Sequence, residues 1–544
     1  MIFIKKSKLL RQFPLNINIL IIIVSLYFGA VLNYPLIQKI YEISNANISL
    51  FIISNLLISS TFVIIFSLLA WPYVFKTILI PLILTSSLTF YASFKYNVMF
   101  DYNMIENIFE TNTGEAFSYL NVSSVLYFIG FGFIPVLLLL KVKIVYGNVF
   151  KGMLFRGALL CSMLVLIGIT TTFYYKDYAS IFRNNSYLKK MINPADVFNT
   201  VKYINKNYLT TPLEYLKLGE DATLTPSSNN KPTLMVLIVG ETARSQNINY
   251  NGYQRKTNPY TEGMGIISFQ NTSSCGTETA ISLPCMFSNM NRSDYSKNRA
   301  VTQDNALDIL TYAGVDVHWI ENDGGHKRVA QNENITKIEI NRSKNDDLCN
   351  KNSCYDEVML REFPSIINQD TTKNKLIAMH LIGSHGPTYY QRYPKDKTVF
   401  TPACNHSDIE NCSIEEIVNV YDNTIVYTDY VIAQTITLLK QYQEHYNIAL
   451  LYVSDHGESL GEKGIYLHGT PYVIAPAEQT KVPWFMWASD EYFSAKGISA
   501  TCLQQIALND SISHDNLFHT LLGFYGVETQ QRQEILDITA HCKL

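Results

Sequence analysis

Five apolar runs in the first third of the chain limit its fold more than any other feature of the sequence. Each run is close to the ~20 residues that a helix needs to cross the hydrocarbon core of a bilayer. They cover residues 16–33, 48–69, 78–94, 122–140 and 153–174. A cleaved signal peptide is an alternative for the first run, and a buried helical bundle is an alternative for the whole set. No convincing small-residue cleavage site follows the first run, so we expect five membrane spans.

Charged residues around these runs indicate how the spans are oriented. Basic residues precede the first run and occur in the second and fourth connections, whereas the loop after the third run is acidic. The basic residues are Lys5, Lys6, Lys8, Arg11, Lys76, Lys141, Lys143, Lys151 and Arg156, and the acidic ones are Asp101, Glu106, Glu110 and Glu115. Because positive charge stays on the cytoplasmic side, the N-terminus is predicted to be cytoplasmic. An odd number of spans then places everything after residue 175 outside.

Composition divides the chain into three predicted parts. Residues 1–175 are the transmembrane domain and residues 233–544 are a large outward domain. Between them, residues 176–218 mix aromatic, apolar and basic side chains, which fits helices at the membrane surface or a solvated connector. Residues 219–232 are rich in Thr, Ser, Asn and Pro, which is typical of a linker. The formal net charge of -3 and the lack of a basic arm argue against binding to nucleic acid.

The outward domain alternates short apolar strands with amphipathic helices. Strands are predicted at residues 234–239, 315–320, 376–382, 448–453 and 482–487. Helices are predicted at residues 304–312, 414–442 and 513–524. Alternation of this kind predicts an α/β fold in which a mostly parallel sheet is covered by helices on both faces.

Eight of the nine cysteines fall after residue 175, which supports the predicted orientation. Cys161 lies inside the fifth apolar run and is expected to be a small apolar residue. An even set in an outward domain predicts an oxidising compartment and disulfides. Zinc binding is the alternative, but the usual C-x-x-C spacing is missing. The close pairs are Cys275/Cys285, Cys349/Cys354 and Cys404/Cys412, which leaves Cys502/Cys542 as a fourth pair that the sequence does not decide.

Polar side chains with catalytic potential follow several of the predicted strands. Glu241 follows the strand at 234–239, His385 follows the strand at 376–382, and Asp455-His456 follows the strand at 448–453. In isolation, each has an ordinary explanation as a capping or turn residue. Together they offer carboxylate and imidazole groups at the carboxyl edge of one sheet, where open α/β folds bind ligands. This mixture of oxygen and nitrogen donors suits zinc.

The outward domain resembles the alkaline-phosphatase/sulfatase superfamily, and the whole chain resembles the lipid A phosphoethanolamine transferases, which include mobile colistin-resistance enzymes. The segments that carry the resemblance are GETAR from Gly240, NGYQRKTNP from Asn251, SCGTETAISLPCMFS from Ser274, GSHGPTYYQRYP from Gly383 and YVSDHGESLGEKGIYLHG from Tyr452. The threonine loop enclosed by two cysteines is the most specific of them. The resemblance extends over essentially the full length.

The resemblance implies roles for individual residues. Thr279 is expected to be the catalytic nucleophile, and Glu241, Asp455 and His456 are expected to join it around one Zn²⁺ ion. Another group is expected to contact the substrate phosphate or to hold a second, weaker metal, and it consists of Thr277, Lys327, His385 and His468. Residues in the acidic loop are expected to bind the lipid head group, namely Asn107, Thr111 and Glu115.

The resemblance also implies an activity and a location. The expected reaction transfers phosphoethanolamine from phosphatidylethanolamine to lipid A or lipopolysaccharide core through a phosphothreonine-type intermediate, which lowers surface negative charge and confers polymyxin resistance. A membrane phosphoglycerol transferase, a phosphatase or sulfatase-like hydrolase, and a non-enzymatic membrane sensor are the alternatives. The expected protein is a monomer in the inner membrane of a Gram-negative bacterium, with its catalytic domain in the periplasm and membrane lipids as its partners. His385 or His468 is the candidate general acid.

Overall fold

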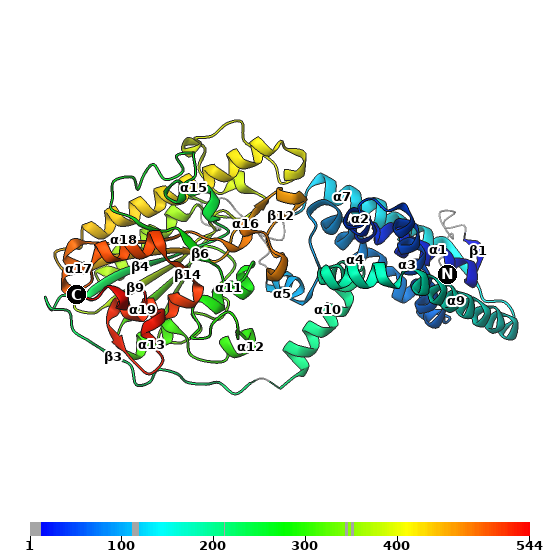
Figure 1. The fold of residues 1–544 in the computed structure, drawn as a ribbon, viewed down its shortest axis with the longest axis horizontal. Helices are drawn as coiled ribbons and strands as arrows, with labels where there is room; N and C mark the ends of the chain where they lie inside the picture. Colours follow the sequence, from blue (N-terminus) through cyan, green and yellow to red (C-terminus); the bar gives the residue numbers. More distant parts are fainter. Residues whose placement is uncertain (1–11, 111–118, 212, 343–345, 350–352) are drawn as a thin grey trace, which may run out of the picture. The chain divides into compact units, whose positions relative to one another are not determined.

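The computed structural model describes residues 12–110, 119–211, 213–342, 346–349 and 353–544. The chain forms two compact units, which are described separately (Figure 1). One unit comprises Met1–Ile105 and Leu120–Leu209, and the other comprises Glu106–Tyr119 and Thr210–Leu544. The segment 176–209 thus groups with the apolar helices, and the acidic stretch from Glu106 groups with the large α/β unit.

Within the described part of the first unit, four helices are long and apolar enough to cross a membrane. They are α3 (Ile48–Leu69), α4 (Val74–Tyr96), the continuous helical stretch Val122–Lys141, and α9 (Val149–Asn184). A fifth candidate is a bent pair, in which Ile17–Leu32 and α2 (Tyr34–Ile43) meet at 50°. The expectation of about five such helices is therefore confirmed, with the first one broken near Asn33 rather than straight.

The apolar surfaces of these helices argue against the bundle of a soluble protein. In the most apolar windows only 22–39% of the residues of α3, α4 and Val122–Lys141 are buried, and none in the window of α9. Helices this apolar and this exposed require an apolar solvent around them. Local signals begin them: the Asn47 side chain accepts from the backbone N–H groups of Ser49 and Leu50, and Asn148 caps α9 in the same way.

The second unit is built on a seven-stranded sheet. In spatial order its strands are β5 (Ile267–Phe269), β13 (Trp484–Ala488), β10 (Asn447–Ser454), β4 (Thr233–Gly240), β9 (Lys375–His380), β7 (Asp316–Glu321) and β8 (Thr336–Glu339). The five strands from β10 to β8 run parallel, and β13 runs antiparallel to both of its neighbours. The predicted mostly parallel sheet is confirmed.

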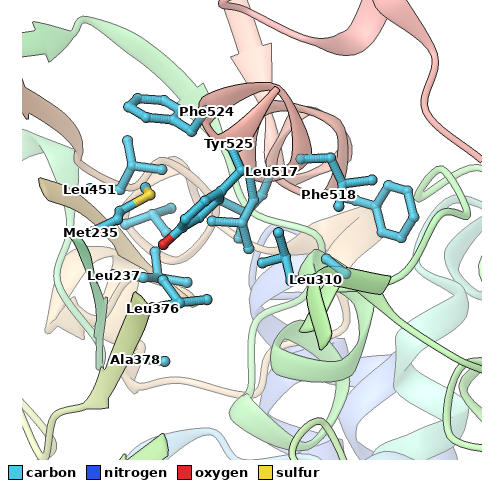
Figure 2. Packing of buried hydrophobic residues seen from close by; sticks show 14 of the residues in the cluster. Met235, Leu237, Leu310, Leu376, Ala378, Leu451, Leu517, Phe518, Phe524 and Tyr525 are labelled. Atoms are coloured by element: carbon cyan, nitrogen blue, oxygen red, sulfur yellow. The ribbon is translucent and has the colours of Figure 1, made fainter. Parts of the chain in front are cut away.

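Helices cover both faces of this sheet. Strands β4 and β10 are buried along their whole length, which explains why their sequences are almost uninterrupted apolar runs. Figure 2 shows α19 (Leu517–Tyr525) packed over Met235, Leu237 and Leu451 on one face, beside α13 (Ala306–Tyr312). The long helix α15 (Ile414–Lys440) lies on the other face (Figure 1).

The ends of helix α15 show how local sequence signals stabilise a helix. Its first residue follows Ser413, whose hydroxyl accepts from the Glu416 backbone N–H, while the Glu416 carboxylate accepts from the Ser413 backbone N–H. This capping box satisfies two N–H groups that the helix itself leaves unpaired. Acidic residues in the first turn and Lys440 in the last turn complement the helix dipole.

Shorter elements complete the two units. They include α10 (Ala195–Ile204) in the first unit, and in the second α11 (Thr279–Met286), α12 (Lys297–Ala300), α14 (Phe363–Ile367), α16 (Ala477–Thr480), α17 (Asp490–Lys496) and α18 (Ala500–Asn509). Small two-stranded sheets pair β14 (Ser511–Ser513) with β6 (Asn271–Ser273), β15 (Val527–Glu528) with β3 (Thr223–Leu224), and β11 (Ser459–Leu460) with β12 (Tyr466–Leu467).

Disulfides join the predicted cysteine pairs of the second unit. The bonds are Cys275–Cys285, Cys349–Cys354 and Cys404–Cys412, and the fourth is Cys502–Cys542, which the sequence had left undecided. Cys161 on α9 is an exposed free thiol.

Candidate active site

Four buried side chains meet at the carboxyl ends of β4 and β10. Glu241 directly follows β4, Asp455 and His456 directly follow β10, and Thr279 is the first residue of α11. The register pairs Gly240 with Ser454, so the two strands deliver their carboxylates side by side. All four side chains are at most 6% exposed.

The spacing of their donor atoms fits one tetrahedral metal ion. Thr279 Oγ1 lies 3.2 Å from Glu241 Oε2 and 3.4 Å from His456 Nε2. His456 Nε2 lies 3.3 Å from Asp455 Oδ2 and 3.5 Å from Glu241 Oε1. Ligand atoms about 2.0–2.1 Å from a tetrahedral zinc ion are about 3.3–3.4 Å apart, which is close to these four distances, in which Glu241 takes part through both carboxylate oxygens. Glu241, Asp455 and His456 form a buried metal-binding group.

The protein orients His456 and Asp455 toward this point. His456 Nδ1 lies 2.9 Å from the Gly457 carbonyl, so Nδ1–H donates there and the Nε2 lone pair faces Glu241. Burial and, to a smaller extent, neighbouring His468 lower the pKa of His456 to about 3, so the ring is neutral at physiological pH. Asp455 Oδ1 accepts from the backbone N–H groups of Thr242 and His456, which leaves Oδ2 for the site.

Two glycines allow the backbone to pass close to these ligands. A Cβ at Gly457 would lie 2.0 Å from the carbonyl oxygen of Glu478. Gly383 has a φ of +48°, and a Cβ there would lie 2.7 Å from the Glu241 carbonyl oxygen. Since backbone atoms cannot yield as a flexible side chain does, a side chain at either position would force the backbone next to His456 or at Glu241 to shift.

The loop that carries Thr279 is fixed on two sides. The Cys275–Cys285 disulfide ties the loop to α11. His514 accepts from the Cys275 backbone N–H through Nδ1 and donates to the Ser454 carbonyl through Nε2. The Ser282 hydroxyl donates to the Asp455 carbonyl. The loop that carries Thr279 is therefore hydrogen-bonded directly to the end of β10.

The two other predicted histidines lie beside this group. The ring of His468 is centred 4.6 Å from that of His456, and the ring of His385 is 5.2 Å from His468. His468 Nδ1 lies 2.9 Å from a carboxylate oxygen of Glu458, a buried residue that also accepts from Tyr389 at 2.6 Å. His385 Nδ1 lies 2.9 Å from the Gly386 carbonyl. Both rings thus use Nδ1 in hydrogen bonds.

The remaining predicted residues include Thr277 and Lys327, which donate hydrogen bonds to backbone carbonyls. The Thr277 hydroxyl donates to the Thr470 carbonyl at 2.7 Å. Lys327 Nζ donates to the carbonyls of Glu110 and Gly324, both at 3.1 Å. Asn107 is on α5 (Tyr102–Glu110), whereas Thr111 and Glu115 lie outside the described residues.

A second carboxylate–histidine group adjoins the first, and the sequence reading missed it. Asp323 and His380 share Glu241 with the first group, and the donor atoms of the three residues lie within 4.8 Å of one another. Burial opposes a charge on His380, yet Glu321 and Asp323 raise its pKa to about 9. The sequence carries part of the signal, because Glu321-Asn322-Asp323 directly follows the predicted strand at 315–320.

The fold and the buried site together define an α/β enzyme of the sulfatase type. The family model described as Sulfatase matches residues 233–527. The family model described as Phosphoethanolamine transferase EptA/EptB matches residues 58–208, the part that holds most of the apolar helices.

The chain belongs to the EptA family of phosphoethanolamine transferases. It is 38% identical to Phosphoethanolamine transferase EptA of Escherichia coli (strain K12), over 99% of both chains. It is 33% identical to Phosphatidylethanolamine transferase Mcr-1 of Escherichia coli, over 94% of this chain and 95% of the relative. The integral membrane lipooligosaccharide phosphoethanolamine transferase A of Neisseria meningitidis has the same fold, with a TM-score of 0.91, 34% identity, and coverage of 96% and 98%. The resemblance seen in the motifs is therefore confirmed.

Proposed function

We propose that this enzyme moves phosphoethanolamine from phosphatidylethanolamine to lipid A or lipopolysaccharide core through a covalent intermediate on Thr279. The observation that carries the proposal is the position of the Thr279 hydroxyl, 3.2 Å from Glu241 and 3.4 Å from His456 in a buried metal-binding group. The names of the relatives support the substrates, since Mcr-1 is a phosphatidylethanolamine transferase and the Neisseria enzyme acts on lipooligosaccharide.

The ion that fits the ligand group is Zn²⁺, held by Glu241, Thr279, Asp455 and His456. A neutral imidazole, two carboxylates and one hydroxyl at tetrahedral spacing suit zinc better than Mg²⁺, which demands octahedral oxygen ligands. When bound, zinc would lower the pKa of the Thr279 hydroxyl and offset the negative charge that develops on the phosphoryl oxygens.

In the first half-reaction, Thr279 Oγ1 forms a bond to the phosphorus of phosphatidylethanolamine. The Thr279 hydroxyl proton passes to His385 or His468, the phosphorus–oxygen bond to diacylglycerol breaks, and the departing oxygen takes that proton from the histidine. In the second half-reaction, a phosphate or hydroxyl oxygen of the acceptor bonds to the same phosphorus. The bond between Thr279 and phosphorus then breaks and Thr279 recovers a proton. The fixed loop around Thr279 lowers the entropy lost in reaching the reactive geometry.

The remaining predicted residues receive roles on the substrate side. Lys327 supplies a point charge for the phosphate, and Thr277 lies beside it. Asn107, Thr111 and Glu115 bind the lipid head group. Capping an anionic phosphate with an amine weakens the attraction of the outer surface for cationic peptides, and polymyxin resistance is the expected consequence.

The proposed location follows from the charge bias and the disulfides. The helices span the inner membrane of a Gram-negative bacterium with the N-terminus in the cytoplasm. The α/β unit, which holds four disulfides, is placed in the oxidising periplasm. From there it can reach both lipids, which lie in the outer leaflet of the inner membrane.

Lipid mass spectrometry tests the reaction. Cells that carry the chain should gain phosphoethanolamine on lipid A, and Thr279→Ala should abolish the gain while Thr279→Ser keeps a measurable part of it. Purified enzyme given phosphatidylethanolamine without acceptor should carry the head group on Thr279. Free phosphoethanolamine with no adduct would indicate a hydrolase instead, and transfer only from phosphatidylglycerol would indicate a phosphoglycerol transferase.

A further inference from the structure

Three adjacent parallel strands bring a second set of metal-type ligands together. Glu241 follows β4, His380 is the last residue of β9, and Asp323 lies just beyond β7. The register aligns Glu321 with His380 and His380 with Val239, so the three strand ends are level. Donor atoms of Glu241, Asp323 and His380 lie within 4.8 Å of one another, and all three side chains are buried.

His380 has the orientation of a metal ligand. Its Nδ1 lies 3.0 and 3.1 Å from the two carboxylate oxygens of Glu321. Glu321 is itself held by the indole N–H of Trp319 at 2.9 Å and by the Asp323 backbone N–H at 2.8 Å. A carboxylate that accepts from one ring nitrogen directs the other nitrogen toward a metal ion and increases its basicity.

The opposite nitrogen of His380 has no hydrogen-bond partner among the described residues. Nε2 is buried, and the Asp323 carboxylate oxygen nearest to it lies 3.9 Å away, which is too far for a hydrogen bond. A buried polar atom without a partner costs free energy unless something else satisfies it. A cation between Nε2, Asp323 and Glu241 would satisfy it.

We propose that Glu241, Asp323 and His380 bind a second zinc ion, with Glu241 bridging it to the first. This inference rests on the proposed zinc site, because the two sites share Glu241. The charge of the region supports the proposal. Four buried carboxylates surround the imidazoles of His380 and His456, namely those of Glu241, Glu321, Asp323 and Asp455. Buried carboxylates require paired positive charge. The site differs from the one expected at His385 and His468, whose Nδ1 atoms face Gly386 and Glu458.

The number of zinc ions bound per chain, measured on the full-length enzyme in detergent, tests the proposal. After dialysis against buffered free Zn²⁺, the wild-type enzyme should hold two equivalents, and Asp323→Asn and His380→Gln should each lose one. The matched control is His468→Gln, which should keep both equivalents. Glu321→Gln should weaken the second equivalent by about 10- to 100-fold. Near-UV circular dichroism would verify that each variant is folded.

Substitution of cobalt for zinc provides a second, spectroscopic readout. Bridged metal ions lie about 3.5–4 Å apart. Wild-type enzyme loaded with two Co²⁺ ions should therefore show magnetic coupling by electron paramagnetic resonance, and Asp323→Asn should show only an isolated ion. An uncoupled pair in the wild type, or a second equivalent that survives in both Asp323→Asn and His380→Gln, would overturn the proposal.

The outcomes separate this inference from the proposed function. If Asp455→Asn loses one equivalent while Asp323→Asn loses none, the catalytic zinc site stands and the second site does not. If Asp323→Asn loses one and Asp455→Asn loses none, the proposed catalytic site fails instead.

Discussion

At the scale of single residues, His514 connects the two halves of the site without reaching the substrate. It forms hydrogen bonds with the Cys275 backbone N–H, in the loop that carries Thr279, and with the carbonyl of Ser454, the last residue of β10. We expect His514→Ala to lower kcat by about 10- to 100-fold with little change in KM, because it loosens the alignment of Thr279 and not the binding of lipid.

The conservative variant separates positioning from a general loss of structure. His514→Gln keeps one acceptor and one donor in its amide, so it should recover part of the lost kcat. The measurement is steady-state kinetics of the two variants and the wild type, compared at equal concentrations of folded protein. Equal loss in both variants, or a rise in KM alone, would contradict a positioning role for His514.

Asp308 makes the stability of the α/β unit depend on pH. It is buried at the start of α13, where it completes a capping box with Asn305, and burial raises its pKa to about 6. The folded state therefore holds the proton more tightly than the unfolded state. The resulting stabilisation is fully present below the unfolded pKa near 3.8 and is lost as pH rises through about 6.

Replacing Asp308 removes this ionisation. The stabilisation should amount to about 1–2 kcal/mol at pH 5 and close to zero at pH 7. Asp308→Asn keeps an oxygen for the Asn305 backbone N–H, so its melting temperature should change less between these two pH values than that of the wild type. An unchanged difference in melting temperature would show that Asp308 does not titrate in this range.

At the scale of elements, α19 is held close to the C-terminal segment by Gly523. A Cβ at this position would lie 2.0 Å from a carboxylate oxygen of Asp537. Asp537 is buried and accepts from Arg532 at 2.6 and 3.0 Å, so it cannot move aside easily. Gly523→Ala should therefore destabilise the unit by about 1–3 kcal/mol, which outweighs the gain of up to about 1 kcal/mol in helix propensity.

Tryptophan fluorescence during heating checks the effect of Gly523→Ala. Three of the four tryptophans, Trp319, Trp484 and Trp487, lie in the α/β unit, so the signal reports mainly on that unit. Gly168→Ala on α9 is the matched control, because its Cβ would meet no atom within 4 Å among the described residues. An equal effect of the two substitutions would contradict close packing at Gly523.

The sequence predicts elements better than it predicts their neighbours. The buried runs of β4, β9 and β10 and the periodicity of α15 identify those elements, because burial on both faces or on one stripe leaves a clear pattern. The antiparallel direction of β13 leaves no such mark, since strand direction depends on the path of the connecting chain. The pairing of Asp323 with His380 was not predicted for a similar reason: the sequence places carboxylates after the strand at 315–320, but only the register of β7 and β9 makes Asp323 and His380 neighbours.

At the scale of the whole molecule, metal binding and stability should be linked. An ion that binds only the folded state stabilises it by about 2.7 kcal/mol at a free concentration of 100 times its Kd. Chelation should therefore lower the melting temperature of the α/β unit by about 5 °C or more, and added Zn²⁺ should restore it. Glu241→Gln should abolish the response to zinc, whereas a response that persists in this variant would place the ion elsewhere.

The apolar helices were predictable because a bilayer imposes one length on all of them. The sequence predicts that the first apolar run ends at residue 33, whereas the structure continues after a 50° bend into α2. Helix α2 has Pro35 in its first turn and carries the polar residues Gln38, Lys39 and Glu42. The grouping of Glu106–Tyr119 with the α/β unit was not predicted either, since it depends on contacts such as the 3.1 Å ion pairs of Lys297 with Glu106 and Glu110.

The long-range pairing of β4 with β10 has a consequence for biogenesis. The hydrogen bond from Thr242 to Asp455 joins residues 213 positions apart, and the two groups meet only when these strands align. A nascent chain that has exported Glu241 and Thr279 still lacks half of the ligands. Ion capture must therefore be a late event of maturation, after translocation is nearly complete, so cells starved of zinc should accumulate a folded but empty precursor rather than a stalled export intermediate.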